Sequence, residues 1–374
     1  MKYVLPLFLL LSSSATAVAD TPQERYLSRK EAKRASQEAV RANQPEPNAA
    51  VTGFLTLTSS KSFADSLGNY VIVGEVRNTS TSAIAFSKIT FTFKNASGAV
   101  VGTDFNYPWG TINGKLSDGT YIDLLRPNDV GFFKVWTTLS FSSIASYTFT
   151  SAGESSTYEV PLANPDPLGP FTVAGLTASA TIKNKGTATS FYTFVVMAAY
   201  QGGSINDLDY EFVDGVRSPC SSDAFSAILT GSTASVLVSF TRPLDSVGRY
   251  FVGYEACAAS TDPALDITLN KYTYVAGDAV STTDFKLRNP GTKSRPVEIK
   301  LYLVMPSGDI TGLVSFGADG SIALPPAFNQ PLGSITIMAI TPSTAKGTYE
   351  FSSRIVDPAS GKLIGENINT FVVQ

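Results

Sequence analysis

Hydrophobic and polar residues alternate along most of the chain after residue 49, in short runs separated by Gly, Asn, Asp and Pro. Residues 71–76, 89–94 and 192–198 are typical runs, and each is rich in Val, Ile, Thr, Phe or Tyr. A period of two places successive side chains on opposite faces of a strand, and no helical period appears after residue 48. The pattern predicts an all-β chain of sandwiches, in which each strand covers a core with one face and meets solvent with the other.

A short motif recurs three times along this β region. It consists of a basic residue, Asn, any residue, a small residue and Thr, and its copies lie at 77–81, 183–187 and 288–292. The asparagines of successive copies are 106 and 105 residues apart. This period is the size of one sandwich domain. The repeat therefore predicts three tandem Ig-like β-sandwich domains over residues 50–162, 168–260 and 264–374, joined by short Pro-containing linkers.

The first repeat carries a more specific pattern over residues 70–136. It contains Val73-Gly-Glu-Val-Arg-Asn-Thr-Ser, then an alternating strand that leads into Asn95-Ala-Ser-Gly, and then Leu125-Arg-Pro-Asn-Asp. This segment resembles the FxLYD domain family of exported prokaryotic proteins. It departs from the family at Lys94-Asn95, where the family has Tyr-Asp, and in an insertion that begins at Gly110. The resemblance implies an Ig-like module without catalytic residues, and the other two repeats resemble generic Ig-like domains of bacterial surface proteins.

The first 19 residues have the three parts of a secretory signal peptide. Lys2 precedes an apolar run over residues 4–11, and small residues end at Ala17-Val18-Ala19. The pattern predicts cleavage before Asp20 and a secreted protein, at the extracellular surface or in the periplasm. The apolar run is much shorter than the roughly 20 residues that a membrane-spanning helix needs, and no later segment reaches that length. The sequence thus predicts no transmembrane segment.

Residues 20–48 form a charged, Ala-rich segment that predicts a short N-terminal helix. Glu31 and Arg34, like Glu38 and Arg41, stand at the i,i+3 spacing that supports a helix. The alanines between them form only a thin apolar stripe, which buries little surface. The segment is therefore predicted to be a solvated helical spacer, with a surface tether or partner-binding helix as the alternative.

Composition removes several classes of function. The chain has no histidine, which excludes Ser-His and Cys-His catalytic arrangements and ordinary zinc sites. Its net charge of −3 and 16% charged residues give no basic surface for nucleic acid. The two cysteines, Cys220 and Cys257, are expected to form a disulfide, since an exported protein meets an oxidising environment.

An aromatic loop is the first candidate ligand site. Tyr107-Pro-Trp109-Gly110 places a tryptophan among turn residues, and Tyr121 lies across the insertion from it. Flat rings on a loop can stack on sugars or anchor a protein partner. The alternative is that Trp109 folds over the edge of the first core, as large aromatics often do. Trp136 stands in an alternating run and is expected in the core.

An acidic segment at residues 206–214 is the second candidate. Alternation places Asp207, Asp209 and Glu211 on one side of an extended segment, and Asp214 follows. Carboxylates in such a cluster can bind calcium or hydrolyse a glycosidic bond. The segment lacks the spacing of a standard calcium loop, however. We therefore predict a solvated loop with no metal-binding and no catalytic residues.

These observations favour a non-enzymatic exported protein that acts as an adhesion, scaffold or assembly module. Its partner would be a protein or glycan of the cell envelope, with no cofactor, and self-assembly through edge strands or the N-terminal helix stays open. The alternative function is a carbohydrate-binding accessory protein that uses the aromatic loop. A third class, a carboxylate hydrolase, would need a cleft lined by Asp209 and Glu211.

Overall fold

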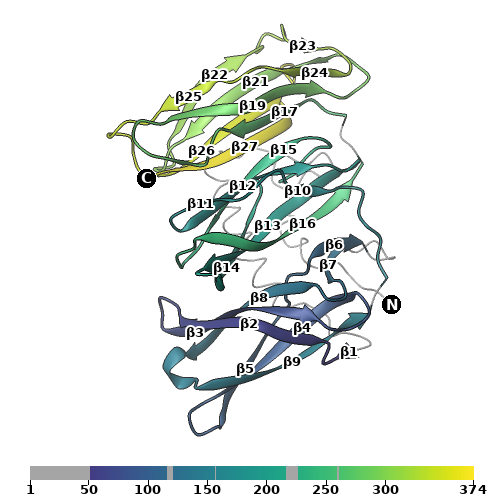
Figure 1. The fold of residues 1–374 in the computed structure, drawn as a ribbon. Coiled ribbons are helices and arrows are strands. Elements are labelled where there is room, and N and C mark those ends of the chain that lie inside the picture. The colour runs from purple at the N-terminus through teal and green to yellow at the C-terminus, as the bar shows by residue number, and fades with distance from the viewer. Residues whose placement is uncertain (1–50, 116–120, 156, 216–225, 259–260) are drawn as a thin grey trace.

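The protein is described by a computed structural model that covers residues 51–115, 121–155, 157–215, 226–258 and 261–374. The predicted signal peptide (1–19) and helical spacer (20–48) lie outside these residues. The described chain contains 27 strands and one 3-10 turn at Phe141–Ser143, and its strands form β-sandwiches (Figure 1). The all-β prediction is confirmed.

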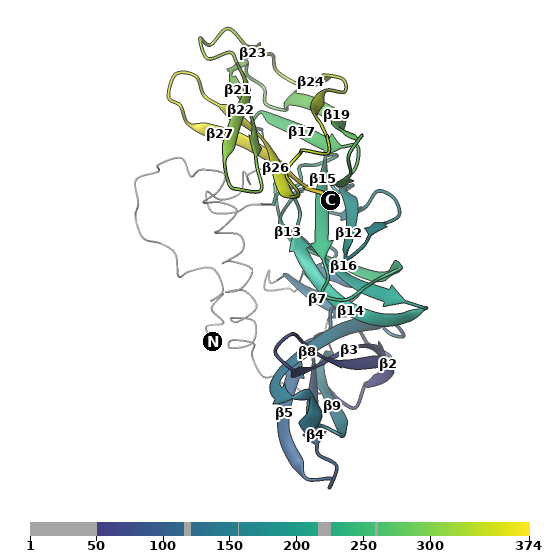
Figure 2. The same ribbon diagram turned by 90° about the vertical axis from the view of Figure 1, so that its left-hand side faces the viewer.

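The sheets fall into three successive groups along the chain, which we name the first module (β1–β9), the second module (β10–β16) and the third module (β17–β27). Figures 1 and 2 show the modules arranged end to end, from purple through teal to yellow. Each module encloses its own hydrophobic core. The domain boundaries expected from the sequence stay a prediction.

The first module has two sheets around a core of aromatic and branched side chains. One sheet has the order β1-β9-β4-β7-β6, with β5 also on β4. Its strands are β1 (Val51–Thr52), β4 (Ile84–Lys94), β5 (Val100–Asn106), β6 (Ile112–Lys115), β7 (Tyr121–Leu125) and β9 (Ser146–Ser155). The other sheet consists of β2 (Leu55–Ala64), β3 (Asn69–Asn78) and β8 (Val130–Ser140). Phe91, Phe93 and Phe133 are fully buried between them.

The second module also has two sheets. One has the order β10-β12-β11, with β15 paired to β12, and the other has the order β14-β13-β16. The strands are β10 (Pro165–Pro167), β11 (Thr172–Ala174), β12 (Thr177–Asn184), β13 (Thr189–Gln201), β14 (Ser204–Phe212), β15 (Thr233–Ser239) and β16 (Ser246–Cys257). Small residues such as Ala178, Ala199 and Ala234 fill much of this core.

The third module is the largest. Its main sheet has the order β18-β27-β26-β21-β22 and faces β17, β19, β24 and β25, while β20 and β23 form a short separate pair. These strands are β17 (Ala264–Leu269), β18 (Thr273–Tyr274), β19 (Ala279–Asn289), β20 (Arg295–Pro296), β21 (Glu298–Val304), β22 (Ile310–Phe316), β23 (Ala323–Leu324), β24 (Phe328–Pro331), β25 (Thr336–Ala339), β26 (Gly347–Val356) and β27 (Leu363–Val373). Strands β18 and β27 are parallel, whereas the other pairs are antiparallel.

The three repeated asparagines make the same hydrogen bonds. Asn78, Asn184 and Asn289 each end a strand and are fully buried. In every copy the side-chain amide donates to the carbonyl four residues ahead and to a carbonyl of a distant segment, while its oxygen accepts the N–H two residues ahead. The distant acceptors are Leu125 O, Ile228 O and Leu324 O, at 2.9, 2.8 and 2.9 Å. The repeat is thus a buried turn that fastens one strand end to a remote segment, and it needs a side chain that both donates and accepts.

Candidate functional site

The aromatic loop of the first module lies against the second module. The indole of Trp109 stacks on Phe251 at 5.8 Å between ring centroids and meets Phe194 edge-to-face at 5.5 Å. The backbone N–H of Trp109 also donates to Phe132 O at 2.8 Å. The ring predicted to bind a ligand, or to cover the first core, therefore packs mainly on rings of another module. Tyr107 packs edge-to-face on Phe105, and Tyr121 begins β7, with its side chain outside the described part of the chain.

A dry cluster of side chains forms this first contact between modules. The first module contributes residues from β2, β3 and β8, and the second contributes residues from β13, β14 and β16. The buried members are Phe63, Val71, Val73, Phe132, Val196, Ala198, Ile205, Leu208 and Phe251. Strands β3 and β13 are therefore buried on both faces, because their alternate residues fill the module cores. The expectation that one face of these strands meets solvent is wrong.

Charged and polar groups surround the dry cluster. Lys134 Nζ lies 2.7 Å from Asp207 Oδ1, and the Asp207 side chain is fully buried. Burial opposes ionisation of Asp207, but the charge and hydrogen bond of Lys134, together with the hydroxyl of Thr241, outweigh it and lower the pKa of Asp207. Lys61 Nζ also donates to Asn206 Oδ1 at 2.7 Å. The predicted solvated acidic loop is thus a strand, β14, whose first carboxylate joins two modules.

A second polar group crosses the same contact. Glu75 accepts hydrogen bonds from Ser59, Tyr200 and Arg249, the last two from the second module. Burial opposes ionisation of Glu75, yet these three donors outweigh it and lower the pKa of this carboxyl. The first and second modules therefore share hydrogen-bonded charges as well as apolar surface.

The remaining acidic residues do not share one site with Asp207. Asp214 accepts a hydrogen bond from Thr370 Oγ1 of the third module at 3.2 Å. Asp209 and Glu211 each accept the N–H of the next residue, at 2.8 and 3.1 Å. No group of three or more His, Cys, Asp or Glu in the described part of the chain could hold a metal ion. The geometry thus separates Asp207 from Asp214, which reach opposite neighbours of the second module.

The second and third modules meet through hydroxyl groups. The Thr233 and Thr268 hydroxyls are 2.9 Å apart, and Ser235 Oγ donates to Asn369 Oδ1 at 3.0 Å. Arg288 of the third module also crosses the contact, since its guanidinium donates to Thr230 O at 3.3 Å and to the Ser232 hydroxyl, and within its own module Arg288 pairs with Asp266 at 2.7 Å. A small apolar cluster crosses the same contact, with Ala227 and Leu229 of the second module against Ala264 of the third, so this contact has less apolar surface than the dry cluster between the first and second modules.

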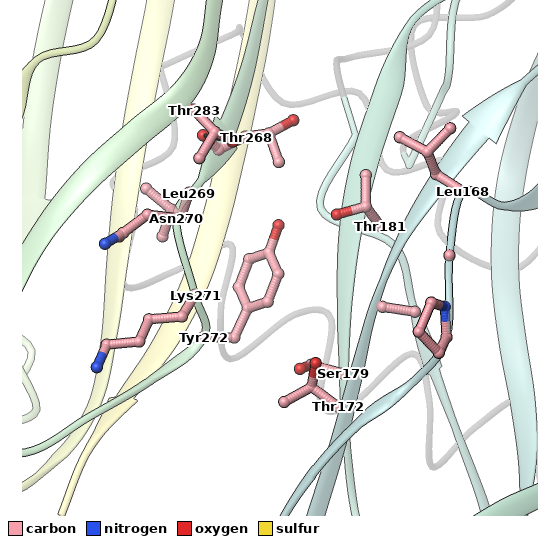
Figure 3. Close-up of a pocket in the computed structure, with 13 residues that line it drawn as sticks. Leu168, Thr172, Ser179, Thr181, Thr268, Leu269, Asn270, Lys271, Tyr272 and Thr283 are labelled. Carbon is pink, nitrogen blue, oxygen red and sulfur yellow. Dashed lines mark hydrogen bonds between the residues drawn. The ribbon is translucent and has the colours of Figure 1, made fainter.

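A cavity of about 340 Å³ opens within this polar contact (Figure 3). The second module lines it with residues 168–170, 172 and 179–181, and the third module lines it with residues 268–272 and 283. Figure 3 shows Tyr272 between the two walls, with its hydroxyl directed toward Thr268 and Thr181. Asp209 and Glu211, the candidate hydrolase pair, do not line this cavity. The sequence analysis missed the site because its walls are separated by almost 100 residues and each wall alone looks like an ordinary polar strand face.

Two other expectations concern tryptophan and cysteine. Trp136 is 49% exposed, and its Nε1 donates to Asp65 Oδ2 at 2.6 Å, so the prediction of a core position is wrong. Its ring lies on the outer face of β8, which alternation alone does not distinguish from the inner face. Cys257 ends β16, whereas Cys220 lies outside the described residues, so the predicted disulfide stays a prediction. None of the described residues belongs to a helix that could span a lipid bilayer.

Comparisons with known proteins identify no family. No protein-family profile matches the chain, and no curated protein matches it, so the FxLYD resemblance stays a prediction. Among solved structures, the chain is similar to red sea bream transglutaminase, with 8% identity, 92% of this chain and 34% of that chain covered, and a TM-score of 0.22. It is also similar to a calcium-binding mutant of Bacteroides uniformis beta-glucuronidase 2, with 10% identity, 59% of this chain and 29% of that chain covered, and a TM-score of 0.23. A third similar structure is Escherichia coli alpha-2-macroglobulin activated by porcine elastase, with 10% identity, 88% of this chain and 33% of that chain covered, and a TM-score of 0.22. The chain spans about a third of each of these proteins, and similarity at this level carries no functional argument.

Proposed function

We propose that the protein is an exported, non-enzymatic scaffold of three Ig-like sandwiches that holds a binding surface at a fixed distance from its attachment point. The contact between the first and second modules is the observation that carries this proposal. It combines a dry apolar cluster with the buried Lys134–Asp207 pair, a construction typical of permanent interfaces rather than of free linkers. A chain built in this way acts as a spacer with a set orientation.

Export is the second part of the proposal. The signal peptide predicted at residues 1–19 and the disulfide predicted between Cys220 and Cys257 both support an envelope or extracellular location. Adhesion, scaffolding and assembly all need a partner at the cell envelope, which would bind loops or edge strands. The glycan function first assigned to the aromatic loop is not carried forward, because Trp109 packs against the second module.

Fractionation of cells that produce the full chain tests this proposal. We expect the mature protein in the envelope or outside the cell, beginning at residue 20, and we expect small-angle scattering of the purified chain to fit an extended particle. Deletion of residues 2–19 is the matched control and should retain the protein in the cytoplasm. An uncut chain in the cytoplasm, or a collapsed particle in scattering, would overturn the proposal.

A further inference from the structure

Two cations meet at one buried amide, at the rim of the contact between the first and second modules. Lys61 of β2 donates from Nζ to Asn206 Oδ1 at 2.7 Å, and Arg242, which follows β15, donates from Nε to the same oxygen at 3.2 Å. Asn206 is fully buried on β14, the strand of the second module that lies against the first module (Figure 1). Its amide nitrogen donates to Pro243 O at 2.6 Å, which fixes the shared oxygen in place. The two positive charges, one from each module, are therefore held close together.

No carboxylate balances these two charges. Lys61 and Arg242 form no ion pair within the part of the chain that the structure describes, and Asp207, the neighbour of Asn206 on β14, is already paired with Lys134. Both cations are half-buried, so water screens them less than it screens fully exposed side chains. Like charges held together in this way repel each other. An anion placed between them would replace the repulsion by attraction.

Arg242 presents its guanidinium group in a fixed orientation. The Cζ atom lies 4.3 Å from the centroid of the Phe63 ring, and Nε is held by Asn206. The two terminal nitrogens, Nη1 and Nη2, have no hydrogen bond to any residue that the structure describes. A guanidinium fixed by stacking and by one hydrogen bond offers its remaining donors as a planar fork, which matches two oxygens of one oxyanion. Lys61 adds a second positive charge beside that fork.

We propose that Lys61 and Arg242 bind the phosphate group of a phosphate monoester at the rim of the contact between the first and second modules. Such a group carries a charge of about −1.5 to −2 at pH 7, which neutralises both cations, whereas a carboxylate neutralises only one. The ligand would bond to one cation of each module, so it would stabilise the contact as well as occupy the site. The inference does not depend on export or on the envelope partner proposed above.

Titration calorimetry of the mature full chain with glycerol 3-phosphate at low ionic strength tests the proposal, with glycerate as the matched probe that carries a carboxylate instead. We expect glycerol 3-phosphate to bind more tightly than glycerate. Its affinity should fall between about pH 7.5 and about pH 5, because the phosphate loses its second charge near pH 6 while Lys and Arg stay charged. Arg242→Gln and Lys61→Gln should each weaken binding about tenfold, the effect of one hydrogen bond to a charged group. Arg77→Gln is the control and should leave the affinity unchanged, since Arg77 is exposed and donates to Asn128 O, away from Asn206.

Sedimentation with phosphatidylcholine vesicles, with and without phosphatidic acid, identifies the source of the phosphate group. Binding that needs both phosphatidic acid and Arg242 indicates a lipid headgroup, and calorimetric binding without vesicle binding indicates a soluble phosphate.

Three outcomes would overturn the inference. The first is that glycerol 3-phosphate does not bind, and the second is that glycerate binds as tightly. The third is that Arg242→Gln and Lys61→Gln lower the unfolding temperature but keep the affinity of the parent chain, which would show that the two cations serve only the contact between the modules. Arg242→Lys keeps the charge but not the fork, so it should retain more affinity than Arg242→Gln.

Discussion

Replacing Lys134 by Met gives the sharpest test of the contact between the first and second modules. The substitution keeps an unbranched side chain that is one heavy atom shorter and removes the cation that pairs with Asp207. The Asp207 side chain is fully buried, so its charge is left without its ionic partner inside the protein. Removing one member of a buried pair costs about 3–5 kcal/mol in unfolding free energy. Thr241 and the backbone N–H of Leu208 still donate to Asp207, so we expect about 3 kcal/mol, the lower end of that range.

The pH dependence of this loss has a defined sign. In the parent chain the pKa of Asp207 is lowered, so the pair contributes stability above the unfolded pKa of about 4 and loses it as pH falls through the folded pKa. In Lys134→Met, burial dominates and raises the pKa of Asp207, so acid neutralises the unpaired charge. The difference between the two proteins should therefore be largest near neutral pH and shrink toward pH 4.

Urea unfolding followed by tryptophan emission measures the effect, because Trp109 lies within the contact and changes environment when the modules separate. Lys185→Met is the matched control, since Lys185 lies 2.8 Å from Asp166, close to the 2.7 Å between Lys134 and Asp207, but these side chains are 46% and 39% exposed. Such an exposed pair contributes about 0–1 kcal/mol. Equal effects of the two substitutions, or a difference that is constant with pH, would refute the reasoning.

Three further substitutions test other parts of the structure. Asn184→Asp replaces a donor to two buried carbonyls by an acceptor and should lower the unfolding free energy by about 2–4 kcal/mol in a urea titration. Asn95→Asp is its control and should change that free energy little, because only the side-chain oxygen of Asn95 is used. Trp109→Ala should cost about 3 kcal/mol, because it removes a partly buried indole that packs on Phe194 and Phe251 beside the dry cluster. Trp136→Ala, at an exposed position, should cost much less, and similar midpoints for the two would contradict the assignment. Burial raises the pKa of Asp123 to about 6, although the hydrogen bond from the Gly110 N–H acts to lower it. The fold therefore loses stability as Asp123 ionises between about pH 4 and pH 6. Asp123→Asn should therefore raise the unfolding temperature at pH 7 more than at pH 4.5, and an equal rise at both values would show that burial is not the cause.

Strand positions and the repeated turn could be predicted from the sequence, because both are local properties. Alternation records which side of a strand faces an apolar environment, and the motif around Asn78 recurs since its hydrogen bonds need an amide at one position in each module. The donor role of that amide could not be predicted, because the acceptors Leu125 O, Ile228 O and Leu324 O lie 35 to 47 residues away.

The contacts between modules could not be predicted from alternation, because a strand face covered by another module has the same pattern as one that covers a core. The run at 194–199, Phe-Val-Val-Met-Ala-Ala, did hold a usable signal, since a continuous apolar run indicates burial on both faces. Asp207 had no comparable signal. A carboxylate in a polar run indicates solvent, and only the approach of Lys134 from the first module makes its burial possible.

The two contacts differ in how they respond to force. Separating the first and second modules exposes Phe132, Phe251 and their neighbours to water and strips a buried carboxylate of its cation, so the free energy rises steeply with any displacement. Separating the second and third modules exposes only a small apolar cluster around Leu229 and Ala264 and exchanges hydrogen bonds, such as those of Thr233 and Asp214, for bonds to water, so it costs less. When the chain is pulled, the second contact is therefore expected to separate before the first.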